Sequence, residues 1–157
     1  MFLYLILTVI FITIDQITKY LTVQNLALFE TKEIIPNFLS FTYIQNEGAA
    51  WSLLEGKMWF FYIITLIVIV FLLYYLYTEG RKNKILGIIL SVILAGTIGN
   101  FIDRVLFQYV VDMIKLEFIN FPIFNVADIL LTIGVATLLF YTVYEDKNSN
   151  PSKGDMR

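Results

Sequence analysis

Two aspartates, Asp112 and Asp128, are the residues of this sequence best suited to chemistry, because both are ionisable and both stand among apolar residues. A charged side chain near hydrocarbon is costly, so it is usually paired, exposed to water or functional. Two carboxylates held close together can share a proton, with one acting as a general base and the other as a general acid. The pair therefore predicts acid–base hydrolysis of the aspartic type, which requires neither histidine nor metal.

Asn100, Asp103 and Arg104 lie just before these aspartates at spacings of three and four residues. On a helix, residues at these spacings share one face. Gly96, one turn earlier, allows close helix contact, and an asparagine can hydrogen-bond across such a contact. Helix packing alone would explain the glycine, but it does not easily explain an asparagine, an aspartate and an arginine together.

The composition is that of a membrane protein. The 157 residues are 59% hydrophobic and 15% charged, and the mean hydropathy is +0.76. A soluble domain would be about half apolar and about a quarter charged. There is no cysteine and no histidine, which excludes disulfides, thiol nucleophiles, Ser-His-Asp catalysis and histidine-ligated metal sites. We therefore expect one integral membrane domain with no cofactor, no metal and no nucleic-acid partner.

Hydropathy predicts four transmembrane helices. They lie at about residues 1–21, 58–78, 85–102 and 126–144. The first has no basic residue at its start and no small-residue cleavage site after it, so it is predicted to be a retained helix rather than a cleaved signal. The second contains no charged residue and is expected to be scaffold without candidate chemistry.

Two short segments outside the helices are predicted to be β-strands. Residues 37–45 and 109–118 are rich in β-branched and aromatic side chains. Asp112 would lie on the apolar face of the second strand. Residues 49–55, with Trp51 as an anchor, fit either an interfacial loop, which composition favours, or a short interfacial helix.

The turn at residues 79–84 sets the predicted orientation. It carries Arg81, Lys82 and Lys84, and short basic loops remain in the cytoplasm. Both termini are then cytoplasmic, residues 22–57 lie outside, and residues 145–157 form a polar, disordered tail. With this topology, the polar clusters of four segments meet at the outer ends of the helices.

Two of these polar groups also have purely structural interpretations. Asp15 and Lys19 are four residues apart and could form an ion pair at the interface. Asn125 and Asp128 fit the N-cap and N3 positions of the last helix, so capping alone could explain them.

Five motifs, taken in order, resemble those of lipoprotein signal peptidase, also called signal peptidase II, of the bacterial cytoplasmic membrane. They are Asp-Gln-Ile-Thr-Lys at 15–19, Asn-Glu-Gly-Ala-Ala-Trp at 46–51, Gly-Asn-Phe-Ile-Asp-Arg at 99–104, Val-Val-Asp at 110–112 and Phe-Asn-Val-Ala-Asp at 124–128. The resemblance covers nearly the whole chain. Ala95-Gly96-Thr97 and Met113 depart from the family's usual residues and should affect packing only.

The hydropathy and the β-cradle that the resemblance implies together predict an all-α transmembrane four-helix bundle with a small extracytoplasmic β-cradle and a short interfacial helix, forming one peptidase domain over residues 1–144. The resemblance implies an aspartic endopeptidase that removes signal peptides from prolipoproteins, cleaving before a diacylglyceryl-modified cysteine. Asp112 and Asp128 would be catalytic. The implied substrate-binding or supporting residues are Asn46, Gly48, Asn100, Asp103, Arg104, Asn125, Ala127, Asp15 and Lys19. Membrane lipid and the cyclic peptide antibiotic globomycin are the other implied partners.

Two other classes of function fit an apolar chain with intramembrane acids. A small ion- or proton-coupled transporter would place its site near the midplane, at the interface of internal repeats, whereas this chain has no repeat and its acids lie near one surface. A non-enzymatic membrane scaffold would lose stability, and not only turnover, when the acids are replaced.

Overall fold

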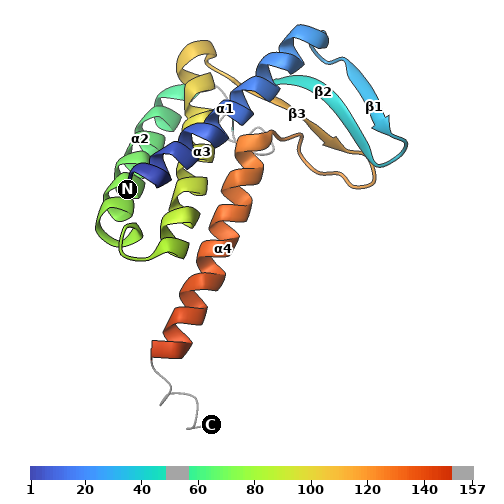
Figure 1. Ribbon diagram of the computed structural model, residues 1–157. Helices are drawn as coiled ribbons and strands as arrows, with labels where there is room; N and C mark the ends of the chain where they lie inside the picture. The colour runs from blue at the N-terminus through green and yellow to red at the C-terminus, as the bar shows by residue number, and fades with distance from the viewer. Residues whose placement is uncertain (49–56, 150–157) are drawn as a thin grey trace.

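The computed structural model describes residues 1–48 and 57–149. Its four long helices are α1 (Phe2–Asn25), α2 (Met58–Tyr75), α3 (Lys84–Phe107) and α4 (Val126–Ser149). Each is long and apolar enough to cross a membrane. α3 is the central helix: 67% of its most apolar window is buried, against 11–22% for the others, and it contacts α1, α2 and α4 (Figure 1).

Three helices extend further than hydropathy predicts. α1 continues to Asn25, α3 to Phe107 and α4 to Ser149, so residues 145–149 are helical and not part of a disordered tail. Apolar stretches mark where a helix can meet hydrocarbon, but polar residues such as Glu and Lys also favour helix. α3 is capped by the residue after it, Gln108, whose left-handed backbone (φ 66°) closes the last turn through an N–H donated to the Arg104 carbonyl at 3.0 Å.

The segment between α2 and α3 is compact. α2 passes into one turn of π-helix, η2 (Leu76–Gly80), and the Asn83 side chain then caps α3 by accepting from the N–H groups of Ile85 and Leu86. Lys82 pairs with Glu79 at 2.9 Å on the surface.

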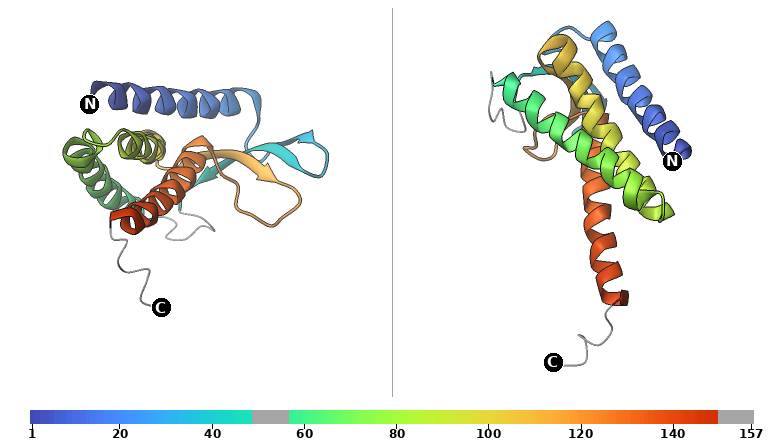
Figure 2. Two further views of the ribbon diagram at one scale, coloured as in Figure 1. Left: turned by 60° about the horizontal axis from the view of Figure 1, so that its bottom comes forward. Right: turned by 90° about the vertical axis from the view of Figure 1, so that its left-hand side faces the viewer.

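The sheet has three antiparallel strands rather than the two predicted. They are β1 (Thr31–Ile35), β2 (Leu39–Asn46) and β3 (Val110–Leu116), in the order β1-β2-β3. β1 was missed because its residues show no apolar alternation and all are exposed, as suits an edge strand carrying Lys32 and Glu33. The sheet projects to one side from the end of the helices (Figure 2). The predicted short interfacial helix at residues 49–55 lies outside the described residues.

A β-bulge in β2 determines which side chain faces Asp112. Phe41 pairs with Ile114, but Ile44 pairs with Asp112, so β2 contains one extra residue in this interval. The shift places Asn46, rather than Gln45, on the same face of the sheet as Asp112. Bulges commonly re-aim side chains beside active sites.

The side chains packed between the helices are mainly apolar at one end of the bundle and include charged and amide groups at the other end. Near the α2–α3 connection the core is aliphatic, and it includes Leu72, Leu76, Leu90 and Leu94. Apolar side chains on α1 and α4 are exposed, as expected for surfaces that face lipid. The buried charged and amide side chains gather at the opposite end, where β3 and the start of α4 meet α1 and α3.

Candidate active site

The segment between β3 and α4 folds back and brings the two aspartates to the same place. Phe124 forms an isolated bridge with Ile114, and the N–H of each donates to the carbonyl of the other, at 2.7 and 3.1 Å. The residue after Phe124 is Asn125, so this bridge sets the start of α4 beside Asp112.

Asn125 and Asp128 form a reciprocal cap at the start of α4. The Asp128 N–H donates to Asn125 Oδ1 at 3.0 Å, and the Asn125 N–H donates to Asp128 Oδ2 at 3.2 Å. The capping interpretation is therefore confirmed, but it is incomplete. Asn125 Nδ2 also donates to Asp112 Oδ1 at 2.7 Å and to Asn100 Oδ1 at 3.0 Å.

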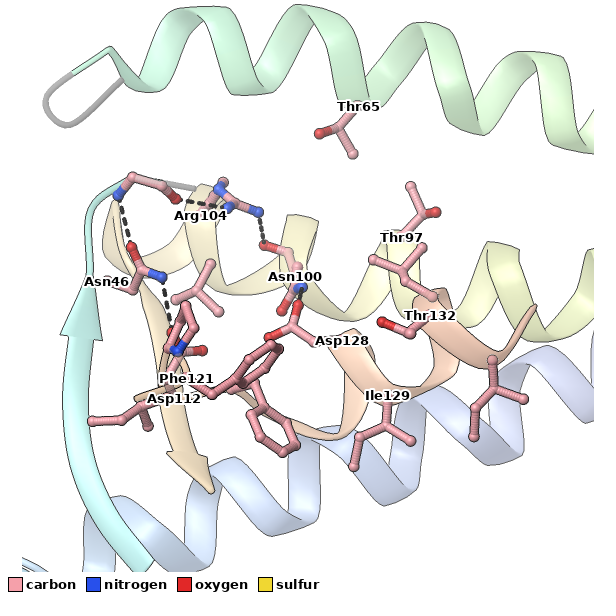
Figure 3. A pocket seen from close by; sticks show the side chains of 17 residues that line it. Asn46, Thr65, Thr97, Asn100, Arg104, Asp112, Phe121, Asp128, Ile129 and Thr132 are labelled. Atoms are coloured by element: carbon pink, nitrogen blue, oxygen red, sulfur yellow. Dashed lines mark hydrogen bonds between the residues drawn. The ribbon is translucent and has the colours of Figure 1, made fainter. Parts of the chain in front are cut away.

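Two further asparagines hold the carboxylates. Asn46 Nδ2 donates to Asp112 Oδ2 at 2.8 Å, and Asn100 Nδ2 donates to Asp128 Oδ1 at 2.7 Å (Figure 3). Both oxygens of Asp112 therefore accept an amide hydrogen bond, and Asp128 accepts one from a side chain and one from the backbone. This arrangement fixes the rotation of both carboxyl groups.

Arg104 connects this group to the chain that follows β2. Its guanidinium donates to the Gly48 carbonyl at 3.1 Å and to the Asn100 carbonyl at 3.4 Å. The Gly48 N–H donates in turn to Asn46 Oδ1 at 2.9 Å. Arg104 thus holds Gly48 in place, and Gly48 in turn fixes the Asn46 side chain.

α2 contributes more than scaffold, contrary to expectation. The Phe61 ring lies 4.7 Å from the Arg104 guanidinium carbon, and the Tyr62 hydroxyl donates to the Arg104 carbonyl at 2.8 Å. Thr65 reaches the cavity described next (Figure 3). An uncharged segment gives little sequence signal for such contacts, because each depends on which face of α2 meets α3.

A cavity of about 590 Å³ opens beside the two aspartates. Polar and charged groups line one part of it, and aliphatic and aromatic side chains line the rest. The lining residues used below are Asn46, Asn100, Arg104, Asp112, Phe121 and Asp128. Such a cavity suits a largely apolar ligand with one polar reacting group.

The two aspartates are not neutralised by a cation. In the described part of the chain, no Lys or Arg nitrogen lies within 4.0 Å of either carboxylate. Burial and, after it, the charge of Asp128 raise the pKa of the Asp112 carboxyl, the hydrogen bonds from Asn46 and Asn125 oppose the shift, and the net result is a pKa of about 7. Asp112 therefore retains its proton up to neutral pH, as a general acid must.

A second polar group lies behind the aspartates. Lys19 Nζ is 2.9 Å from Asp15 Oδ2 and 3.0 Å from Asp103 Oδ2, and all three side chains are buried. The predicted interfacial pair of Asp15 and Lys19 is therefore a buried cluster that includes Asp103. Gln16, which sequence reasoning did not select as a site residue, donates to Asp103 Oδ1 at 3.0 Å.

Every candidate site residue of the sequence analysis lies in or beside these two groups, with Gly48 and Ala127 contributing through their backbone. Among residues 1–48 and 57–149, no three His, Cys, Asp or Glu side chains gather as metal ligands would.

Comparison with known proteins assigns the family. The sequence profile of the family described as Signal peptidase (SPase) II matches residues 7–144. The lipoprotein signal peptidase of Enterococcus faecalis is 52% identical over 150 residues, which cover 96% of this chain and 93% of the relative. The chain belongs to the signal peptidase II family. This assignment supports the peptidase hypothesis and not the transporter alternative.

Further members and solved structures agree with this family. The lipoprotein signal peptidase of Latilactobacillus sakei is 48% identical, with 94% of this chain and 97% of the relative covered. A bacterial membrane enzyme solved by the in meso method at 2.3 Å resolution superposes with a TM-score of 0.88 at 36% identity, covering 100% of this chain and 94% of that one. A second, solved at 1.9 Å resolution, gives 0.84 at 40% identity, covering 90% and 93%. Four apolar helices with a small antiparallel sheet are thus the architecture of a membrane enzyme of this family.

Proposed function

We propose that this enzyme removes the signal peptide from diacylglyceryl-modified prolipoproteins by cleaving before the modified cysteine, with Asp112 and Asp128 as the catalytic pair. The observation that carries the proposal is the placement of two carboxylates, neither in a direct ion pair within the described residues, at the polar end of a largely apolar cavity. A lipid-modified peptide combines the same properties, since it presents a polar scissile amide next to acyl chains.

The proposed chemistry divides the two roles between the aspartates. Asp128 carries the charge and takes a proton from a water as that water attacks the scissile carbonyl carbon. Asp112 gives its proton to the carbonyl oxygen, forming a neutral tetrahedral intermediate. When the intermediate collapses, the C–N bond breaks, the proton on Asp128 passes to the leaving amine, and the proton on the intermediate's hydroxyl returns to Asp112. The pair ends as it began, with one shared proton.

The surrounding residues support this chemistry by orientation. Asn46, Asn100 and Asn125 each donate to a catalytic carboxylate, at 2.7–2.8 Å. We assign to them the task of holding the two carboxyl planes toward the cavity. Arg104 holds the Gly48 carbonyl, and its charge lies at the cavity wall, where it can attract substrate carbonyl oxygens.

The partners follow from the cavity and its setting. Aliphatic and aromatic lining residues, including Phe121, suit the acyl chains of the substrate. Globomycin, the cyclic peptide antibiotic that the family resemblance implies as an inhibitor, is expected to occupy the same cavity and so to compete with substrate. Bilayer lipid is expected around the exposed apolar surfaces of α1 and α4.

We assign the enzyme to the bacterial cell membrane, with residues 1–144 as one peptidase domain, the sheet and the aspartates on the outer face, and both termini in the cytoplasm. Support comes from the basic η2–α3 turn, because short basic loops remain inside. The chain has no natural cysteine, so Asn37→Cys and Lys82→Cys each create a single thiol at an exposed position. An impermeant thiol reagent added to intact cells should label position 37 only. Labelling of position 82 alone would reverse the topology.

The decisive functional experiment uses the purified enzyme and two forms of one prolipoprotein, with and without the diacylglyceryl group. We expect cleavage of the modified form at the bond before the cysteine and at least about a hundredfold slower cleavage of the unmodified form, because the lost binding energy of the acyl chains also lowers the rate. Equal cleavage of both forms would contradict the assigned substrate. Mass spectrometry of the products identifies the bond.

A further inference from the structure

Two buried carboxylates hold the backbone immediately before the two proposed catalytic aspartates. Asp15 Oδ1 accepts from the N–H of Ala127 at 2.8 Å, and Ala127 directly precedes the aspartate of α4. Asp103 Oδ2 accepts from the N–H of Val111 at 3.1 Å, and Val111 directly precedes the aspartate of β3. The two contacts are equivalent, although they come from different helices and hold different kinds of element.

Lys19 joins the two carboxylates to each other. Its Nζ lies 2.9 Å from Asp15 Oδ2 and 3.0 Å from Asp103 Oδ2, and the lysine is 3% exposed. Without the lysine, two buried carboxylates would face one another with no cation between them, so either one would take up a proton or the two would move apart. Either change would alter the contacts that hold the strand and the helix carrying the catalytic pair.

Lys19 also fixes the orientation of an amide that reaches the catalytic pair. Asn100 Oδ1 accepts from Lys19 Nζ at 3.1 Å and from Asn125 Nδ2 at 3.0 Å. An ammonium group can only donate, so the oxygen of this amide must face the lysine. The Asn100 NH₂ is thereby directed to Asp128, where it donates at 2.7 Å.

We propose that Lys19 is a positioning residue for catalysis: with Asp15 and Asp103 it forms a bridge that fixes the separation of Asp112 and Asp128 and the direction of the Asn100 amide. This inference rests on the proposed function, because it takes these two aspartates as the catalytic pair. Lys19 does not line the cavity, so it contacts neither substrate nor the attacking water.

The bridge requires close approach of α1 to α3. A Cβ atom on Gly99 would lie 2.6 Å from Asp15 Oδ2, so any larger residue there would displace the carboxylate. The Gly99 carbonyl also accepts from Lys19 Nζ at 3.4 Å and from Gln16 Nε2 at 3.2 Å. The bridge of Asp15, Lys19 and Asp103 can therefore form only because Gly99 has no side chain.

The test compares Lys19→Met with a control substitution at another position of the contact between α1 and α3. Thr8→Val removes a buried hydroxyl whose hydrogen is shared between the Tyr4 carbonyl of its own helix at 2.9 Å and the Ser91 carbonyl of α3 at 3.3 Å, in the apolar half of the enzyme. For both variants, kcat and KM on a diacylglyceryl-modified prolipoprotein are measured per folded molecule, with the folded fraction taken from gel filtration and thermal unfolding. Asp112→Asn is included to test the proposed function.

We expect Lys19→Met to lower kcat about a hundredfold, the size expected for a misplacement of about 1 Å at the reacting groups, with KM changed less than about threefold. Thr8→Val should keep kcat within about twofold of wild type. If Lys19→Met does not fold, Asp103→Asn takes its place: it keeps the side-chain shape, weakens the bridge and should lower kcat about tenfold.

Three results would overturn the inference: a folded Lys19→Met enzyme with wild-type kcat, an effect on KM alone, or an equal loss of kcat in Thr8→Val. Where Lys19→Met does not fold, wild-type kcat in Asp103→Asn would do the same. Failure of the proposed function is distinguishable, because Asp112→Asn would then cleave the substrate or the wild-type enzyme would not.

Discussion

Two neighbouring polar layers at the same end of the helices use the same residue types for different purposes. The cavity layer contains Asn46, Asn100, Asp112, Asn125 and Asp128. The rear layer contains Asp15, Gln16, Lys19 and Asp103. In the rear layer each carboxylate contacts a lysine and also accepts a backbone N–H. In the cavity layer the donors to the carboxylates, among residues 1–48 and 57–149, are neutral amides and backbone N–H groups.

The difference shows two ways in which a protein can bury carboxylates: in contact with a cation, or held by neutral donors. A cation in contact with a carboxylate stabilises its ionised form, and neutral donors do so less strongly. The rear layer is therefore suited to holding the backbone in place, while the cavity layer, where the pKa of Asp112 is raised, is suited to exchanging a proton. Both layers require buried polar contacts, but only the second is suited to acid–base chemistry.

The largest predicted effect comes from removing the ability of the cavity layer to exchange protons. Asp112→Asn and Asp128→Asn should each lower kcat by about 10³-fold or more, since one general acid or base is lost and the partner cannot replace it. Both variants should still fold, because the amide is isosteric and needs only a local rearrangement of donors. Cleavage is measured with the modified prolipoprotein and folding by thermal unfolding. Loss of folded protein in both would favour a structural role instead.

A smaller effect is expected from disturbing the rear layer while leaving all charges in place. Gly99→Ala inserts a methyl group against the Asp15 carboxylate and should lower kcat about tenfold to a hundredfold by displacing the backbone before Asp128.

Gly134→Ala is the matched control for this change. A Cβ there would lie 2.6 Å from Ile93 Cγ1 in the apolar part of the α3–α4 contact, so it also crowds two helices. It should lower the unfolding temperature while leaving kcat within about twofold of wild type. If both alanine variants lost kcat equally, the rear layer would have no special connection to the reaction.

Much of the cavity layer could be predicted from the sequence. Acids and asparagines are conspicuous in an apolar chain, and the i,i+4 spacing of Asn100 and Arg104 predicts a common helix face. The cap formed by Asn125 and Asp128 was also predictable, because it is local. These residues require only knowledge of the secondary structure in which they lie.

The parts of the site that the sequence did not predict depend on contacts between segments that are far apart in the sequence. No pattern near Lys19 shows that Asp103, 84 residues later, joins its pair with Asp15. The bulge that selects Asn46 rather than Gln45 follows from the pairing of β2 with β3, and local residue preferences do not specify it. The contacts of Phe61 and Tyr62 with Arg104 likewise follow from the rotation of α2 against α3.

The central claim is that the aspartate pair works with one shared proton, and the pH dependence of kcat/KM tests it most directly, since kcat/KM reports ionisations of the free enzyme. Because the pKa of Asp112 is raised to about 7, its proton is present below that pH and is lost as the pH rises through it. The rate should therefore fall above about pH 7.

At low pH both aspartates are protonated and no base remains, so the curve should be bell-shaped, with apparent pKa values that belong to the pair. The chain has no histidine, so no imidazole of the enzyme can produce the falling limb, and a chelator present throughout should leave the curve unchanged. A bell whose upper limb lies near pH 7 is the result we predict. A rate that rises to a plateau and stays there through pH 9, or one abolished by the chelator, would contradict the account.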